Sequence, residues 1–148
     1  MNIELVKDFV DYGIIGLLGF MSFITFWFWI ERLFFYRKIN LNNYTNKELL
    51  EVDLTKHINI LSSFGSNAPY IGLLGTVIGI IITFYIMGQN GEIDVKNIMT
   101  SLALALKATA MGLLVAIPAI FLYSHLVRKI EVLLAKWEVL KKDNNLAN

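Results

Sequence analysis

The sequence predicts an all-α integral membrane protein with three transmembrane helices. Three stretches of the 148-residue chain are almost free of charge. As helices, they are long enough to cross a bilayer core of about 30 Å. Overall, 56% of the residues are hydrophobic and only 17% are charged, against about 25% charged residues in soluble domains. The charges are therefore concentrated between and beyond these stretches.

The first predicted span covers residues 13–30, which include no charged residue. Near its end lies the triplet Trp27-Phe28-Trp29, two residues before Glu31 and Arg32, and tryptophans at such a boundary indicate the membrane–water interface. Residues 1–12 carry three acidic residues and one lysine, which is the wrong charge sign for a signal peptide. We expect this segment to be short and periplasmic or interfacial.

The second predicted span covers residues 68–87. Pro69 lies in its first turn, where the missing N–H is not needed. A connection over 88–97 leads to the third span, residues 98–123, which contains one charge, Lys107. It also contains Pro118. Because an internal proline removes one helix hydrogen bond, Pro118 predicts a kink.

Two segments outside the membrane are predicted to form amphipathic helices. In the loop 31–67, the run Thr45-Asn46-Lys47-Glu48 matches a capping box, and apolar residues then recur at 3–4 spacing over about 46–64. The third helix continues into the tail 124–148 with the same spacing. We expect this extension to project into water and pack on a partner helix, and the alternative is a helix lying on the membrane surface.

The basic residues predict the orientation. Of the thirteen lysines and arginines, ten lie in the loop 31–67 and the tail 124–148. Only Lys7 and Lys96 lie on the opposite side, and Lys107 is within the third span. The positive-inside rule places the loop and the C-terminus in the cytoplasm, and the N-terminus and the 88–97 connection in the periplasm.

Small and hydroxyl-bearing residues form a stripe along one face of the second and third spans. In the second span the stripe consists of Gly72, Thr76, Gly79 and Thr83. In the third span it consists of Ala105, Thr109, Gly112 and Ala116, at the same steps. Such stripes are typical of close helix packing. They also suit the wall of a pore, because a hydroxyl can hydrogen-bond water or an ion without bringing a charge into lipid. Periodicity alone does not decide between these interpretations.

Lys107 is a charge within a predicted span, where its burial costs from a few to about 10 kcal/mol. It lies two residues from Thr109 and so points about 200° away from the threonine stripe. No carboxylate lies within any predicted span. We expect Lys107 either to extend to the outer headgroups or to pair with a carboxylate or carbonyl of another subunit.

Several classes of function are not indicated. The chain has no cysteine, which excludes disulfides, zinc–thiolate sites and cysteine nucleophiles. His57 and His125 have no evident partners for a metal, and there is no phosphate-binding glycine loop or Ser/His/Asp set. A net charge of +1 gives no argument for nucleic acid. We expect no enzyme activity and no cofactor.

Two runs closely resemble the signatures of the ExbB/TolQ/MotA proton-channel family. The first is APYIGLLGTVIG at 68–79, and the second is ALKATAMGL at 105–113 followed by AIPA at 116–119. They occur in order, on the second and third of three spans. The resemblance covers about residues 66–127 and favours an ExbB-type member, whereas the first span fits only in its placement.

This resemblance implies a homo-pentamer in the bacterial inner membrane, surrounded by lipid, with single-span partner helices of the ExbD type in a central pore. An aspartate of the partner carries protons down the gradient, and the motion is passed to a TonB-type transducer that energises transport across the outer membrane. The family's pore threonines fall on Thr76 and Thr109, and Thr83 continues the same stripe.

One position departs from the family pattern. Many relatives have a glutamate five residues before the third-span threonine, whereas this chain has Leu104. The partner's aspartate is then the protonatable group that the resemblance provides. The alternatives are a TolQ-type subunit of the Tol-Pal system and a passive scaffold for a single-span partner, in which the stripes are only packing seams.

Overall fold

The computed structural model of the chain describes residues 2–91 and 94–147. These residues form the helices α1 (Ile3–Lys38), α2 (Lys47–Leu54), α3 (Ile58–Asn90) and α4 (Val95–Leu146), with a short 3-10 turn, η1 (Leu41–Asn43), after α1. Helices α1, α3 and α4 are long and apolar enough to cross a membrane. The predicted all-helical fold with three membrane-crossing helices is confirmed.

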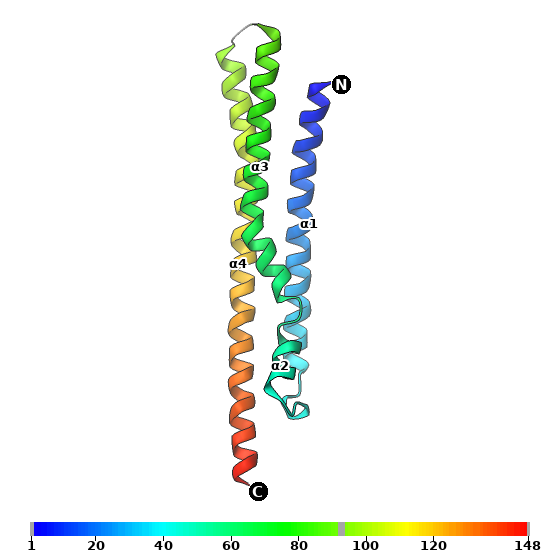
Figure 1. Cartoon of the computed structure of the whole chain (residues 1–148), viewed down its shortest axis with the longest axis vertical. Helices are drawn as coiled ribbons and strands as arrows, with labels where there is room; N and C mark the ends of the chain where they lie inside the picture. Colours follow the sequence, from blue (N-terminus) through cyan, green and yellow to red (C-terminus); the bar gives the residue numbers. More distant parts are fainter. Residues whose placement is uncertain (1, 92–93, 148) are drawn as a thin grey trace.

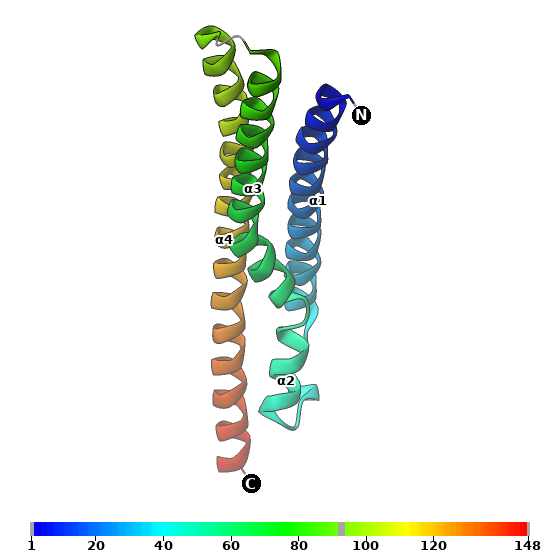
Figure 2. The ribbon, with the colours of Figure 1, turned by 45° about the horizontal axis from the view of Figure 1, so that its top comes forward.

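The long helices form an elongated bundle (Figure 1). Helices α3 and α4 pack along each other as an antiparallel pair, and α1 lies beside that pair and contacts both (Figures 1 and 2). The start of α1 and the α3–α4 connection lie at one end, which we call the N-terminal end of the bundle. The basic loop with α2 lies with the chain's C-terminus at the other end, the C-terminal end of the bundle.

The helices extend beyond the predicted spans, whose limits in the membrane stay predictions. Helix α1 begins at Ile3, so the N-terminal segment is continuous with the first span. At the connection 88–97, Gly91 ends α3 in a left-handed conformation (φ 68°). Asp94 begins α4 by accepting a hydrogen bond from the N–H of Lys96 at 2.9 Å. Residues 92–93 of that connection, and the terminal residues 1 and 148, lie outside the described residues.

The single amphipathic helix predicted over about 46–64 is wrong. The chain turns between α2 and α3, so the region holds one short helix and the first turns of a long one. The capping residue is Asn46 rather than Thr45, and its side chain accepts a hydrogen bond from the N–H of Glu48 at 2.8 Å. An asparagine cap satisfies one of the free N–H groups at the start of a helix.

The break between α2 and α3 is centred on His57, whose φ of 66° lies in the left-handed region that residues other than glycine rarely adopt. Its ring stacks on that of Phe28 in α1, with the ring centroids 4.5 Å apart. Periodicity does not reveal this break, because the residues on both sides are buried in one core. They are Leu50, Leu54, Ile58 and Leu61.

Both prolines lie inside helices. Pro69 is in the interior of α3 rather than at a helix start, because α3 begins eleven residues earlier, at Ile58. Figure 1 shows the first part of α3 inclined to the remainder, and a proline, which cannot donate to the carbonyl four residues before it, is a common cause of such a bend. Helix α4 continues through Pro118 without interruption, and the kink predicted there stays a prediction.

Two apolar clusters hold the bundle together. The larger, at the C-terminal end, consists of Tyr36, Leu50, Leu54, Ile58, Leu61, Leu126, Ile130 and Trp137. The smaller consists of Leu18, Met21, Ala68 and Ala116. In the most apolar stretches of α1, α3 and α4, only 17%, 28% and 22% of the residues are buried. The chain therefore has large apolar faces that lipid or further protein must cover.

Candidate functional site

The two predicted stripes face each other along the interface between α3 and α4. All their members are buried except Thr109, which is half-buried. The large aliphatic residues on the opposite face of α3, among them Leu73, Leu74 and Ile81, are exposed. The glycines and alanines of the stripes therefore form a helix-packing seam within one chain, and both threonine positions lie in it.

Gly72 and Gly112 bring the two helix backbones into contact. A Cβ atom on Gly72 would lie 2.6 Å from the carbonyl oxygen of Ala108, and a Cβ atom on Gly112 would lie 2.7 Å from that of Ala68. Because backbone atoms of packed helices cannot give way easily, only glycine fits at both positions. At Gly79 a Cβ atom would lie 2.9 Å from the Cβ atom of Ala105, so the seam stays tight one level further along.

This close approach joins Thr76 and Thr109 by a hydrogen bond. Their hydroxyl oxygens lie 2.6 Å apart, and either hydroxyl can donate. The Thr76 oxygen also lies 2.9 Å from the carbonyl oxygen of Ala105, and the Thr109 oxygen lies 3.4 Å from that of Gly72. Thr76 is 6% exposed. The pair is thus a polar contact inside an otherwise apolar seam.

The hydroxyl pair has two possible directions of donation. In one, Thr109 donates to Thr76, which donates to the Ala105 carbonyl. In the other, Thr76 donates to Thr109, which donates to the more distant Gly72 carbonyl. Each hydroxyl has a single proton, so the two arrangements exclude each other. Each arrangement ends on a backbone carbonyl oxygen, and the half-buried Thr109 hydroxyl is the member of the pair that can exchange hydrogen bonds with a group outside the seam.

Thr83 does not join this pair. Its buried hydroxyl donates to the Gly79 carbonyl oxygen of its own helix at 2.8 Å. It also lines a polar pocket of about 300 Å³ at the N-terminal end of the bundle, together with Glu4, Lys7 and Asp94. The predicted stripe therefore contains two separate polar levels along α3.

Lys107 has an intrachain neighbour that the sequence did not indicate. It lines a small cavity together with Asp11, Leu104 and Ala108. Leu104 stands where many members of the resembled family have a glutamate. The acidic residue that lines the same cavity is Asp11 of α1 instead. In the sequence Asp11 belongs to the N-terminal segment 1–12, and no pattern there indicates that α1 packs against α4. Among the described residues, no group of three or more His, Asp or Glu side chains is placed to hold a metal ion.

A polar junction at the C-terminal end was also not foreseen. Arg32 is 3% exposed, and its guanidinium donates to the Glu31 carboxylate and, at 3.1 Å, to the Asp53 carbonyl oxygen. The hydrogen bond from Arg32 lowers the pKa of Glu31. The Tyr36 hydroxyl donates to the Leu54 carbonyl oxygen at 2.6 Å, and burial raises the pKa of Tyr36 to about 12. These contacts fasten α2 to α1.

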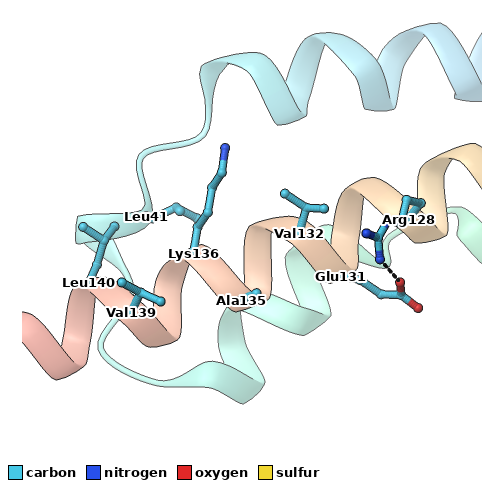
Figure 3. A pocket seen from close by; sticks show the side chains of 8 residues that line it. All are labelled: Leu41, Arg128, Glu131, Val132, Ala135, Lys136, Val139 and Leu140. Atoms are coloured by element: carbon cyan, nitrogen blue, oxygen red, sulfur yellow. Dashed lines mark hydrogen bonds and ion pairs between the residues drawn. The ribbon is translucent and has the colours of Figure 1, made fainter.

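An apolar groove of about 540 Å³ runs along the exposed side of α4 at the same end. Figure 3 shows that Leu41 approaches it from the loop, whereas its other residues, including Val132, Val139 and Leu140, come from one long helix. Arg128 and Glu131 form an ion pair at its edge, with 3.3 Å between nitrogen and oxygen. The groove is a further uncovered apolar surface, beyond the predicted third span.

Residues 29–139 match the MotA/TolQ/ExbB proton channel family, and this segment contains both stripes, the hydroxyl pair and all of the groove except Leu140. The chain belongs to this family. It is 55% identical over 134 residues to a Helicobacter pylori protein named putative biopolymer transport protein ExbB-like 2, a match that covers 90% of this chain and 89% of the relative.

Two further relatives are named biopolymer transport protein ExbB. The Aquifex aeolicus protein is 51% identical over 137 residues, with 93% of each chain covered. A Helicobacter pylori protein is 49% identical over 140 residues, with 95% of this chain and 97% of the relative covered. The ExbB-type assignment is confirmed, and the chain is a multi-pass membrane protein of a proton-channel family.

Proposed function

We propose that this ExbB-type chain is the inner-membrane channel and motor subunit that, with a single-span partner of the ExbD type, uses the proton motive force to energise TonB-dependent transport across the outer membrane. The observation that carries the proposal is the Thr76–Thr109 hydroxyl pair, with its oxygens 2.6 Å apart and two possible directions of donation. A packing seam does not need a hydroxyl that can both donate and accept, whereas a pore wall that hydrogen-bonds water and a protonatable partner group does.

The two threonines have different roles in this proposal. Thr109 is half-buried and presents its side chain at the edge of the seam, where it can meet pore water. Thr76 is buried behind it, and its hydroxyl can donate to or accept from that of Thr109, so the Thr109 hydroxyl can switch between accepting and donating toward the pore. Thr83 lines the polar pocket at the N-terminal end of the bundle, which is the entrance to the pore in this proposal. Since Leu104 carries no acid, the group that takes up the proton opposite Thr109 is the aspartate of the partner.

The pore itself requires several copies of the chain. We propose a homo-pentamer, with the apolar groove on α4 covered by a neighbouring subunit. The low burial of the apolar faces supports such an assembly. The basic residues gathered at the C-terminal end of the bundle support a cytoplasmic location for that end and a periplasmic location for the N-terminus.

Reconstitution tests the proposed function. The chain is co-purified with its ExbD-type partner, inserted into liposomes and subjected to a proton gradient, and flux is followed with a pH-sensitive dye inside the liposomes. Flux is expected with both proteins present and not with either protein alone. Flux that is absent from the complex, or that does not depend on the partner, would contradict the proposal.

The glycine contacts favour one alternative, a passive scaffold that only stabilises a single-span partner. A seam in which Gly72 meets the Ala108 carbonyl explains the stripes as packing alone. The two functions differ in how they respond to chemistry at constant shape. Replacing threonine by valine keeps the volume and removes the hydroxyl, so a scaffold tolerates this change and a proton path does not.

A further inference from the structure

Two opposite charges from different helices line one small cavity between α1 and α4. Asp11 belongs to α1 and Lys107 to α4, and the cavity of about 70 Å³ between them is otherwise lined by Ile15, Leu104 and Ala108. In the single chain Asp11 is half-buried and Lys107 is exposed. The apolar lining gives neither charge another polar partner within this cavity.

The cavity lies where the first predicted span begins, because Asp11 comes two residues before that span, whereas Lys107 lies within the third. A Cβ atom on Gly75 would lie 2.7 Å from the Ala108 side chain and 2.8 Å from that of Ile14, so these residues are level with the middle of the second predicted span. The pocket at the N-terminal end contains Lys7, one helical turn before Asp11. Asp11 therefore lies about 6 Å deeper than that pocket, between it and the Gly75 level.

Lys107 is a charge within a predicted span, where a lone lysine is unfavourable. Such residues usually pair with an opposite charge or with backbone carbonyls. The three ion pairs in direct contact among the described residues all lie toward the C-terminal end, and none involves Asp11 or Lys107. The cavity between the two charges is large enough for a few water molecules, and the flexible lysine stem can cross it.

We infer that Asp11 and Lys107 form a charge pair, direct or bridged by water, that holds α1 against α4 beside the threonine pair. The pair supplies within one chain the counter-charge that Lys107 needs. It also fixes α1 next to Ala108, the residue that precedes Thr109 and packs on Gly75. This role is structural and holds whether or not the chain conducts protons.

A double-mutant cycle on the full chain, purified with its partner, tests the inference. Asp11→Asn and Lys107→Met each leave one charge uncompensated, and each is expected to lower the unfolding temperature by roughly 4–8 °C. The double variant carries neither charge, so its shift is expected to be no larger than that of either single variant. Shifts that add, or a single variant without a shift, would overturn the inference.

Matched controls lie nearby on the same helices. Asp8→Asn and Lys96→Met make the same substitutions at positions that do not line the cavity, and both are expected to leave the unfolding temperature unchanged. Should a single variant not be recovered, the charges are exchanged as Asp11→Lys with Lys107→Asp. The exchanged protein is expected to give more monodisperse complex than either single reversal. An exchanged protein no better than the single reversals would contradict the pair.

Discussion

Gly72 and Gly112 set the distance between α3 and α4 at the level of the threonine pair. A Cβ atom on either glycine would lie 3.0 Å from the Cα atom of the other. Any larger residue must push the backbones apart, and the hydroxyl contact between Thr76 and Thr109 would lengthen with them. At the scale of single residues, the seam and the candidate proton path thus depend on the same two positions.

This dependence predicts the effect of Gly112→Ala. The added methyl would lie 2.7 Å from the Ala68 carbonyl oxygen, so the variant is expected to lose about 1–3 kcal/mol of stability, measured by thermal unfolding of the purified protein. Gly88→Ala is the control, because nothing lies within 4 Å of its Cβ position. Equal stability of the two variants would show that the seam is looser than the contacts indicate.

At the scale of elements, the junction of α1 with α2 depends on Tyr36. Tyr36→Phe is expected to cost about 1 kcal/mol at neutral pH, because the Leu54 carbonyl loses its donor. Thermal unfolding of the purified protein at about neutral pH measures the loss. The variant Tyr12→Phe is the control, because Tyr12 is exposed. A loss no larger than that of the control would contradict the role of Tyr36.

The same residue predicts how stability changes at alkaline pH. Burial raises the pKa of Tyr36 from 10.0 to about 12, so its contribution is complete below pH 10.0 and is lost as the pH rises to about 12. The unfolding temperature of the unmodified chain should therefore fall more steeply over this range than that of Tyr36→Phe. Lys47 also titrates at alkaline pH, but it is present in both proteins and contributes equally to both curves. If the unfolding temperatures of the two proteins fell in parallel with pH, the Tyr36 hydroxyl would not be buried as the structure shows.

The sequence predicts individual helices better than the contacts between them. Regular spacing places Thr76 and Thr109 each on the small face of its helix, but it carries no information on which faces meet. It misses the break at His57, because a left-handed residue leaves the apolar spacing intact. It also misses that Asp11 and Lys107 line one cavity, because this neighbourhood arises only when α1 packs on α4.

At the scale of the whole molecule, the uncovered apolar surface predicts assembly. Val139→Asp places a charge in the groove, where Val139 is 58% exposed. If a neighbouring subunit covers the groove, native mass spectrometry is expected to show fewer pentamers and more smaller species. Asn144→Asp adds the same charge to α4 outside the groove and should leave the distribution unchanged. Identical spectra for both variants would place the subunit contact elsewhere.

Proton flux through the reconstituted complex of the Thr76→Val/Thr109→Val variant tests the central claim most directly. Its control is Thr76→Ser/Thr109→Ser, which keeps both hydroxyls. The valine variant is expected to assemble normally but to conduct about tenfold less, equivalent to losing one hydrogen bond of about 1.4 kcal/mol, while the serine variant conducts. Unreduced flux in a correctly assembled valine variant would contradict it and leave the threonines as packing residues.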